Sequence, residues 1–235
     1  MGANQKEAVA ALHRERMLAA AEELFQQKGF EQTTIDDISK ASGYSRRTLY
    51  AYYVNKEDFL RQIVRKGLRQ LDGALEAAVG RKTFEIRYFA ACEAILRYLR
   101  ECPQSAAQVQ QVQPQQLDGS DPTVGEILAL GQRINERLAE MIRQGQAEGT
   151  VRAALHPERC TMVLWSALSG LNDTLQRQGA FLAEQFEISQ EEFQWEALEQ
   201  LLADSSDAAH MILRCKPDST AVAASSSASR AQSRE

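Results

Sequence analysis

Two adjacent arginines at the start of a short predicted helix carry the most distinctive chemistry in the sequence. Arg46 and Arg47 follow Ser45, whose hydroxyl can accept a hydrogen bond from an exposed N–H and so begin a helix. A guanidinium can donate two parallel hydrogen bonds to O6 and N7 of guanine, worth about 1–3 kcal/mol of discrimination between bases. The arrangement therefore indicates base recognition by the first turn of this helix.

Neighbouring side chains offer groups that bind a DNA backbone. Thr48 can reach a phosphate or place its methyl group against thymine, and Tyr50 can extend its hydroxyl to a phosphate. Thr34, Ser45 and Lys56 each stand at a predicted helix start, where free N–H groups and the helix dipole favour an anion.

Two short helices joined by a tight turn must position these side chains. The stretch 34–37 has the composition of a capping box and predicts a helix that ends near Ala41. Gly43 can take the positive φ that the following turn requires, and Leu49 is expected to point inward from the next helix. A pair of helices with a Gly-containing turn is typical of a helix-turn-helix, whose second helix enters the major groove.

An interaction protein with surface arginines fits the same pattern, because many helical hairpins never touch DNA. The charge distribution adds a weak indication. The whole chain has a net charge of −5, but residues 1–70 hold 12 Lys and Arg against 9 Asp and Glu, and the remainder holds 15 against 23. A basic N-terminal module on an acidic body is compatible with a nucleic-acid partner.

The stretch 33–60 strongly resembles the DNA-binding domain of the TetR family of regulators, and residues 20–30 resemble the first helix of that domain. The resemblance implies that Arg46 and Arg47 occupy the variable base-recognition positions and that Tyr52 stands where the family has His or Tyr. It further implies backbone contacts from the positions that match the family's phosphate-binding residues. With Ser45, these positions form the predicted DNA-contact set: Thr34, Ser45, Arg46, Arg47, Thr48, Tyr50, Tyr52 and Lys56.

The rest of the chain is predicted to be helical, so the fold class is all-α. Apolar residues recur at helical spacing over 83–101, 122–148, 157–178 and 191–215, and we expect no strand. The Gln-rich stretch 104–116 predicts a short irregular helix or a loop, and residues 216–235, rich in Ser and Ala, a disordered tail. The expected domains are a helix-turn-helix domain over 1–60, an effector-binding and dimerisation domain over 61–215, and the tail.

The resemblance also implies that the larger domain dimerises and encloses a small molecule. Two leucine-rich helical stripes are the predicted dimer interface: Leu164, Leu168, Leu171, Leu175, Leu198, Leu201, Ser205 and Ala208. Apolar helix faces with a few polar groups are the predicted effector site: Phe89, Cys92, Leu96, Trp165, Ser169 and Asn172. The alternative for both sets is burial in the core of one chain.

An enzyme is disfavoured, because the three histidines lie far apart and no catalytic or metal-binding motif is present. We expect no cofactor, no metal and no membrane span, and a cytoplasmic location with reduced cysteines. We predict a homodimeric transcription factor that an unknown small molecule releases from a palindromic operator. The family resemblance implies that it is a repressor. The alternatives are an all-α interaction protein and a redox-sensing regulator without an effector.

Overall fold

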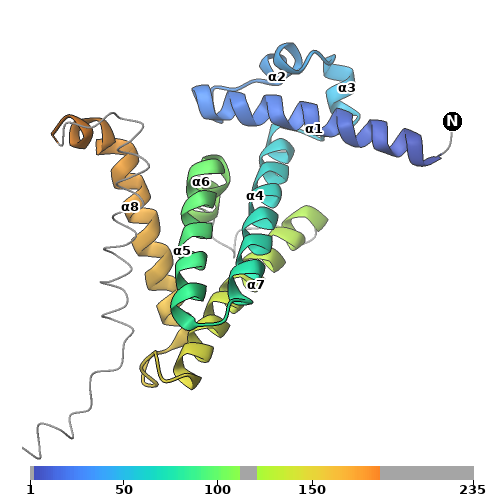
Figure 1. The fold of residues 1–235 in the computed structure, drawn as a ribbon. Helices are drawn as coiled ribbons and strands as arrows, with labels where there is room; N and C mark the ends of the chain where they lie inside the picture. The colour runs from blue at the N-terminus through green and yellow to red at the C-terminus, as the bar shows by residue number, and fades with distance from the viewer. Residues whose placement is uncertain (1–2, 112–120, 186–235) are drawn as a thin grey trace, which may run out of the picture. The chain divides into compact units, whose positions relative to one another are not determined.

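The computed structural model describes residues 3–111 and 121–185, and every regular element in this part of the chain is an α-helix (Figure 1). The all-α prediction is therefore confirmed. The helices are α1 (Ala3–Lys28), α2 (Ile35–Ser42), α3 (Arg46–Tyr50), α4 (Lys56–Val79), α5 (Phe84–Glu101), α6 (Pro103–Gln111), α7 (Pro122–Ala147) and α8 (Pro157–Gln185). The predicted helix over 191–215 and the tail over 216–235 lie outside the described residues.

Local capping groups set the starts of α2, α3 and α4 and the end of α2 where the sequence predicts. Thr34 caps α2 in a complete capping box with Asp37, and Gly43 closes the same helix with φ 75°. The hydroxyl of Ser45 accepts a hydrogen bond from the Thr48 N–H at 3.1 Å and begins α3. The Asp58 N–H donates to Asn55 Oδ1 at 2.8 Å at the start of α4. These bonds satisfy N–H groups that a helix terminus otherwise leaves without a partner.

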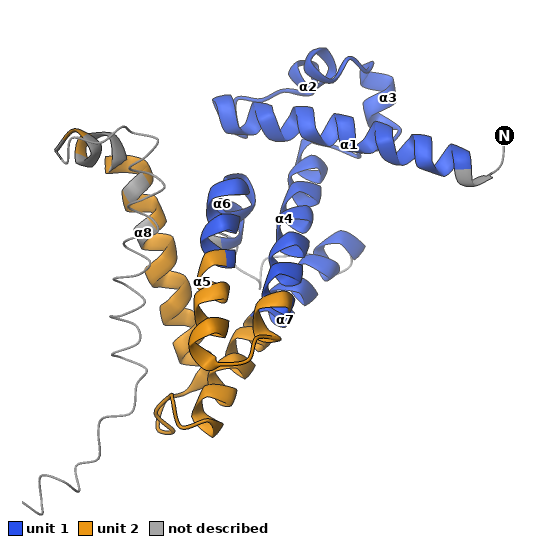
Figure 2. Ribbon diagram, in the orientation of Figure 1, with its two compact units in different colours: residues 1–76, 94–134 blue, residues 77–93, 135–235 orange. Residues whose placement is uncertain are grey.

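The chain divides into two compact units (Figure 2). Unit 1 comprises residues 1–76 and 94–134, and unit 2 comprises residues 77–93 and 135–235. The division falls within α4, α5 and α7. The domain boundaries expected at residues 60 and 215 stay a prediction.

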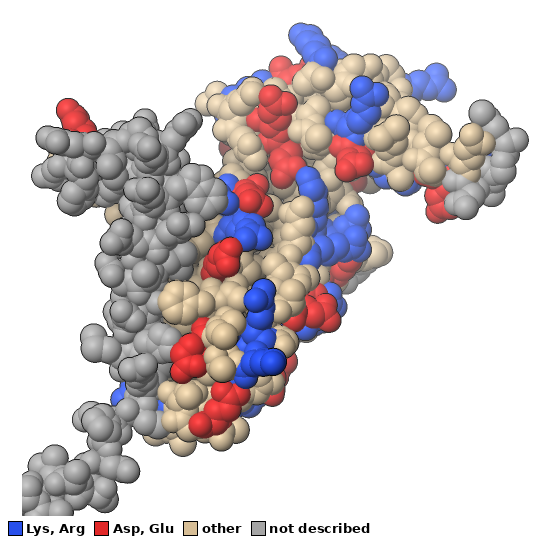
Figure 3. All heavy atoms as spheres, in the orientation of Figure 1, with Lys and Arg blue, Asp and Glu red and all other residues tan. Residues whose placement is uncertain are grey.

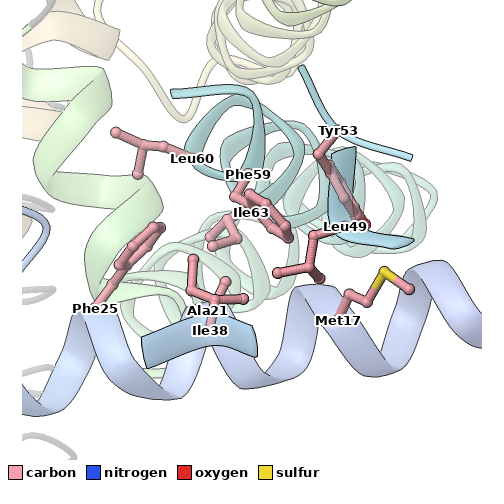
Figure 4. Packing of buried hydrophobic residues seen from close by; sticks show 9 residues of the cluster. All are labelled: Met17, Ala21, Phe25, Ile38, Leu49, Tyr53, Phe59, Leu60 and Ile63. Atoms are coloured by element: carbon pink, nitrogen blue, oxygen red, sulfur yellow. The ribbon is translucent and has the colours of Figure 1, made fainter. Parts of the chain in front are cut away.

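Nine buried side chains from α1 to α4 form the core that holds the two short helices of unit 1 (Figure 4). They are Met17, Ala21, Phe25, Ile38, Leu49, Tyr53, Phe59, Leu60 and Ile63. The Tyr53 and Phe59 rings stack with centroids 3.8 Å apart, and the Tyr53 hydroxyl donates to the Arg14 carbonyl oxygen at 2.9 Å. Since full burial of one large apolar side chain is worth about 1.5–3 kcal/mol, this cluster is the main source of stability for a helix as short as α3.

Residues 103–111 of the Gln-rich stretch form α6, a regular helix that is held within unit 1. Gln104 Nε2 donates to the Phe25 carbonyl oxygen at 3.1 Å, and the fully buried Ser105 hydroxyl lies 2.8 Å from the Tyr98 hydroxyl. A loop is therefore the wrong interpretation of residues 103–111, because contacts to α1 and α5 order them. Residues 112–120 lie outside the described part of the chain.

The described part of unit 2 contains the first half of α5, the second half of α7, and α8. Phe84 and Tyr88 stack at 5.8 Å, and Gly145 lies so close to Phe84 and Val151 that a Cβ atom would collide with both. The buried Arg87 pairs with Glu148 and donates to the carbonyl oxygens of residues 81 and 82. Helix α8 ends at 185, seven residues later than the sequence predicts.

Candidate nucleic-acid interface

Helix α3 has a buried face and an exposed face, and the predicted base-recognition residues lie on the exposed one. Leu49 is 1% exposed and packs in the core cluster, as predicted. Arg46 and Arg47 are exposed, and Tyr50 is 55% exposed despite its large aromatic ring. An exposed Tyr beside two exposed arginines offers stacking surface, a hydroxyl and two guanidinium groups on one short helix.

The two arginines differ in their surroundings. The Arg46 guanidinium forms a two-pronged ion pair with the carboxylate of Asp36 on α2, with Nε on one oxygen and Nη2 on the other. Arg47 has no side-chain hydrogen bond or ion pair with any of the residues that the structure describes. One guanidinium is therefore oriented by the protein, whereas the other is free to adapt to a partner.

The start of α2 is already occupied by groups of the protein. Asp37 Oδ2 accepts hydrogen bonds from the Thr34 backbone N–H at 2.8 Å and from the Thr34 hydroxyl at 2.6 Å, and Lys28 Nζ lies 2.6 Å from the same oxygen. The bond to Lys28, followed by those to Thr34, holds the pKa of the Asp37 carboxyl far below its usual range. A phosphate contact at Thr34 therefore needs this network to open or to share its donors.

Ser45 and Thr48 form a local pair at the start of α3. Their hydroxyl oxygens lie 2.8 Å apart, and Ser45 also caps the helix. Tyr52 is half-buried, with the Arg14 guanidinium 5.3 Å from its ring centre. His13 Nδ1 lies 2.6 Å from the Tyr44 hydroxyl, so the same part of α1 is tied to the turn between α2 and α3.

Lys56 makes intramolecular contacts that the sequence does not predict. Its ammonium donates to the Phe30 carbonyl oxygen at 2.9 Å and to the Glu31 carbonyl oxygen at 3.4 Å. It also lies 4.2 Å from the centre of the Phe30 ring, within cation–π range. Its role as a phosphate contact stays a prediction, since an ammonium has three N–H donors and two are used here.

Two residues that bear on the site were absent from the predicted set. Thr33 is 1% exposed and its hydroxyl donates to the Gly29 carbonyl oxygen at 2.8 Å, which fixes the loop before α2. Asp36 is the ion-pair partner of Arg46. The sequence contains no separate signal for either role. Thr33 merely adjoins the predicted cap Thr34, and an Asp in the first turn of a helix is already accounted for by the helix dipole.

The face of the molecule drawn in Figure 3 shows Lys and Arg side chains projecting from the part of unit 1 that carries α2 and α3. Asp and Glu side chains are interspersed with them, including in this part. On this face, attraction to a polyanion depends on a few placed cations rather than on one continuous basic patch.

Comparison with known proteins identifies the module. Residues 17–63 match the family described as "Bacterial regulatory proteins, tetR family". Residues 17–63 are therefore a TetR-family segment of the chain. The matched residues run from Met17, the first member of the core cluster, to Ile63, the last, and so contain all of α2 and α3.

Named relatives match the chain over short stretches. Over 64 residues the chain is 41% identical to the HTH-type transcriptional regulator YfiR of Bacillus subtilis, covering 26% of this chain and 31% of YfiR. Over 51 residues it is 39% identical to IcaR of Staphylococcus epidermidis, a negative transcriptional regulator of the biofilm operon icaADBC, covering 22% and 28%. The match spans less than a third of the length of these relatives.

Solved TetR-family structures match over a longer span. The regulator PfmR of Thermus thermophilus aligns with a TM-score of 0.58 and 27% identity, over 66% of this chain and 84% of PfmR. The ketosteroid regulator KstR2 of Mycobacterium tuberculosis aligns with a TM-score of 0.62, over 86% and 95%, but at 16% identity it supports the fold alone.

The predicted effector residues differ widely in exposure. Cys92 and Leu96 are buried and Asn172 is 9% exposed, whereas Phe89 is 42% exposed and Trp165 and Ser169 are half-buried. A cavity of about 330 Å³ in unit 1 contains none of them. It is lined by Ala19, Glu22, Glu23, Gln26, Lys66, Gln70, Glu101 and Cys102. The effector site therefore stays a prediction.

Two of the predicted dimer residues, Leu164 and Leu168, have side chains that the structure describes. Leu164 and Leu168 are 8% and 4% exposed within one chain, which agrees with the alternative of burial in the chain's own core. The side chains of Leu171 and Leu175 are not described, and Leu198, Leu201, Ser205 and Ala208 lie outside the described residues. Among the described side chains of α8, the large exposed apolar ones are Met162, Val163 and Phe181.

The described cysteines are free thiols, and burial raises the pKa of each. For Cys92 the pKa rises to about 12. Since the thiolate is the reactive form, a raised pKa disfavours the redox-sensing alternative at Cys92, Cys102 and Cys160.

Within the described residues, no group of His, Cys, Asp and Glu could hold a metal ion, and no helix has the length and apolar character to cross a bilayer.

Proposed function

We propose that the chain is a transcriptional regulator that binds double-stranded DNA through α3 and acts as a repressor in the cytoplasm. The observation that carries this proposal is the exposure of Arg46, Arg47 and Tyr50 on a helix whose opposite side is anchored by the buried Leu49. Such a helix can enter a major groove without losing its packing. Thr34, Ser45, Thr48, Tyr52 and Lys56 are the proposed backbone contacts.

We infer that the protein binds a palindromic operator as a homodimer, because two copies of α3 can then meet half-sites about one helical turn apart. The exposed Met162, Val163 and Phe181 of α8 support a dimer contact on this helix. The small residues Ser166, Ala167 and Gly170 are also exposed between them. A face with small residues between larger apolar ones lets two helices approach closely.

Release by a small molecule is the remaining part of the proposal. A ligand can shift DNA affinity only if it binds one state of the protein better than the other, so a state with altered spacing of the two α3 helices is the expected target. The predicted residues on α5 and α8 provide apolar surface with a few polar groups, a combination that suits a lipophilic ligand.

Fluorescence anisotropy of the full chain with DNA from the region upstream of its own gene tests the central claim. We expect saturable binding by one dimer, at least about 10³-fold tighter than to a scrambled duplex, with a steep loss of affinity as salt rises. Equal, weak binding to both duplexes would contradict the proposal for this region of DNA.

The double substitution Arg46→Ala/Arg47→Ala should abolish the preference for the specific duplex while the melting temperature and dimer mass stay unchanged. The matched control is Arg81→Ala/Lys82→Ala, which removes two adjacent, exposed basic side chains from unit 2. Unchanged specificity in the first variant, or an equal loss in both, would favour the all-α interaction protein in which these arginines are ordinary surface residues.

A further inference from the structure

We propose that Asp36 is a specificity-determining positioning residue: it holds the Arg46 guanidinium in one orientation, with a free pair of donors directed at guanine. The inference rests on the proposed DNA-binding function and adds a residue outside the predicted DNA-contact set. Asp36 lies in the first turn of α2, ten residues before Arg46, and the two side chains meet across the helix-turn-helix.

The ion pair uses one edge of the guanidinium and leaves another free. Nε contacts Oδ1 of Asp36 and Nη2 contacts Oδ2, so the carboxylate occupies the side edge of the Arg46 fork. A guanidinium has five N–H donors in a rigid plane, and the end edge keeps one N–H on Nη2 and one on Nη1. That pair has the spacing that binds O6 and N7 of guanine together.

Exposure shows that the held side chain remains available to a partner. The side chain of Arg46 is 64% exposed and that of Asp36 is 43% exposed. A long side chain that is ordered before binding loses less conformational entropy when it binds. Arg47 lacks such a partner among the described residues, so the two arginines should contribute differently to specificity.

Two simpler roles for Asp36 make different predictions. A carboxylate in the first turn of a helix interacts favourably with the helix dipole, and its removal would lower the stability of the fold. A carboxylate near DNA repels phosphate, and its removal would strengthen binding to every sequence equally. Neither role changes the preference for one base at one position, so base preference is the readout that separates them.

The experiment begins with selection of bound sequences from a randomised pool of double-stranded DNA by the full-length wild-type chain. Arg46→Ala then identifies the guanine position whose preference it loses. Anisotropy is measured on four duplexes that differ only in the base pair at that position, with wild type, Asp36→Asn, Asp36→Ala and the control Glu57→Ala. Glu57 is an exposed carboxylate in the first turn of α4.

We expect Asp36→Ala to lower the preference for guanine at that position by about fivefold, which corresponds to the cost of ordering one long side chain. Asp36→Asn, which keeps one acceptor oxygen toward Arg46, should lie between Asp36→Ala and wild type, and Glu57→Ala should match wild type. An unchanged preference in Asp36→Ala, or an equal change in affinity for all four duplexes, would overturn the inference while the proposed function stands. A wild-type chain that enriches no sequence would overturn both.

Discussion

The ammonium of Lys56, the first residue of α4, lies 4.2 Å from the centre of the Phe30 ring and 2.9 Å from the Phe30 carbonyl oxygen. The residue is thus bound to the loop between α1 and α2, although its position in the sequence suggests a phosphate contact. An ammonium has three N–H donors, so Lys56 can contact both Phe30 and a phosphate. The first contact affects the stability of the fold, and the second affects the salt dependence of DNA binding.

Substitution Lys56→Ala should lower the free energy of unfolding by about 1–2 kcal/mol, because it removes a charged hydrogen bond and a cation–π contact. Urea unfolding at pH 7 measures this loss. If Lys56 also contacts a phosphate, the slope of log K for DNA binding against log salt concentration should become shallower by about one. A change in the salt dependence with no change in stability would show that the contacts to Phe30 contribute little.

The ion pair between Lys28 and Asp37 makes stability depend on pH. Because Lys28 and Thr34 hold the folded-state pKa of Asp37 below its unfolded value near 4, the carboxylate stabilises the fold above about pH 4. This contribution is lost progressively as the pH falls below that value. The difference in unfolding free energy between wild type and Asp37→Asn should therefore be largest near neutral pH and shrink below pH 4.

Urea titrations of wild type, Asp37→Asn, Lys28→Met and the double variant between pH 3 and pH 7 check this expectation. The two substitutions should be less than additive at pH 7, because either one removes the same ion pair. Additive effects at neutral pH, or a difference that grows as the pH falls, would contradict the assignment.

Two glycines of α4 should respond in opposite ways to alanine. A Cβ atom at Gly67 would lie 2.8 Å from Ser105 Oγ and 3.2 Å from the Tyr98 ring, whereas a Cβ at Gly73 meets nothing within 4 Å. Gly67→Ala should cost about 1–3 kcal/mol through overpacking. Gly73→Ala should stabilise the chain by about 0.5–1 kcal/mol, since alanine is the better helix former.

Thermal and urea unfolding of the two variants provide the comparison, and Gly67→Ala/Ser105→Ala should recover part of the lost stability. Equal effects of the two alanines would show that α4 and α6 do not pack as closely as the structure has them.

Substitutions on α8 separate the proposed dimer face from the core of unit 2. Val163 is 60% exposed and Leu164 is 8% exposed, although the residues are adjacent. Val163→Glu should shift the mass measured by light scattering from dimer to monomer with little change in unfolding within each chain. Leu164→Ala should instead cost about 2–5 kcal/mol of stability through a cavity.

Ile86→Glu, at a 48% exposed apolar position on α5, is the matched control and should leave the dimer mass unchanged. A dimer that survives Val163→Glu but is lost in Leu164→Ala would favour the leucine stripe that the sequence predicts.

The sequence by itself determined the helical fold class and the positions where the short helices begin and end. Thr34, Gly43, Ser45 and Asn55 act on backbone groups within four residues of themselves, so their effects can be derived from the order of residues alone. The inward direction of Leu49 follows from helical spacing in the same way.

Tertiary structure alone decided which charged side chains pair and which apolar faces remain exposed. Asp36 meets Arg46, and Lys56 meets Phe30, because separate helices pack around the core cluster, and no local rule specifies those partners. Likewise, Leu164 is buried and the adjacent Val163 is exposed. The apolar periodicity of α8 does not predict this difference, because it does not specify which side of the helix another element covers. Long-range packing supplies that choice, and it determines which residues are left for the proposed contacts with DNA and with a second copy.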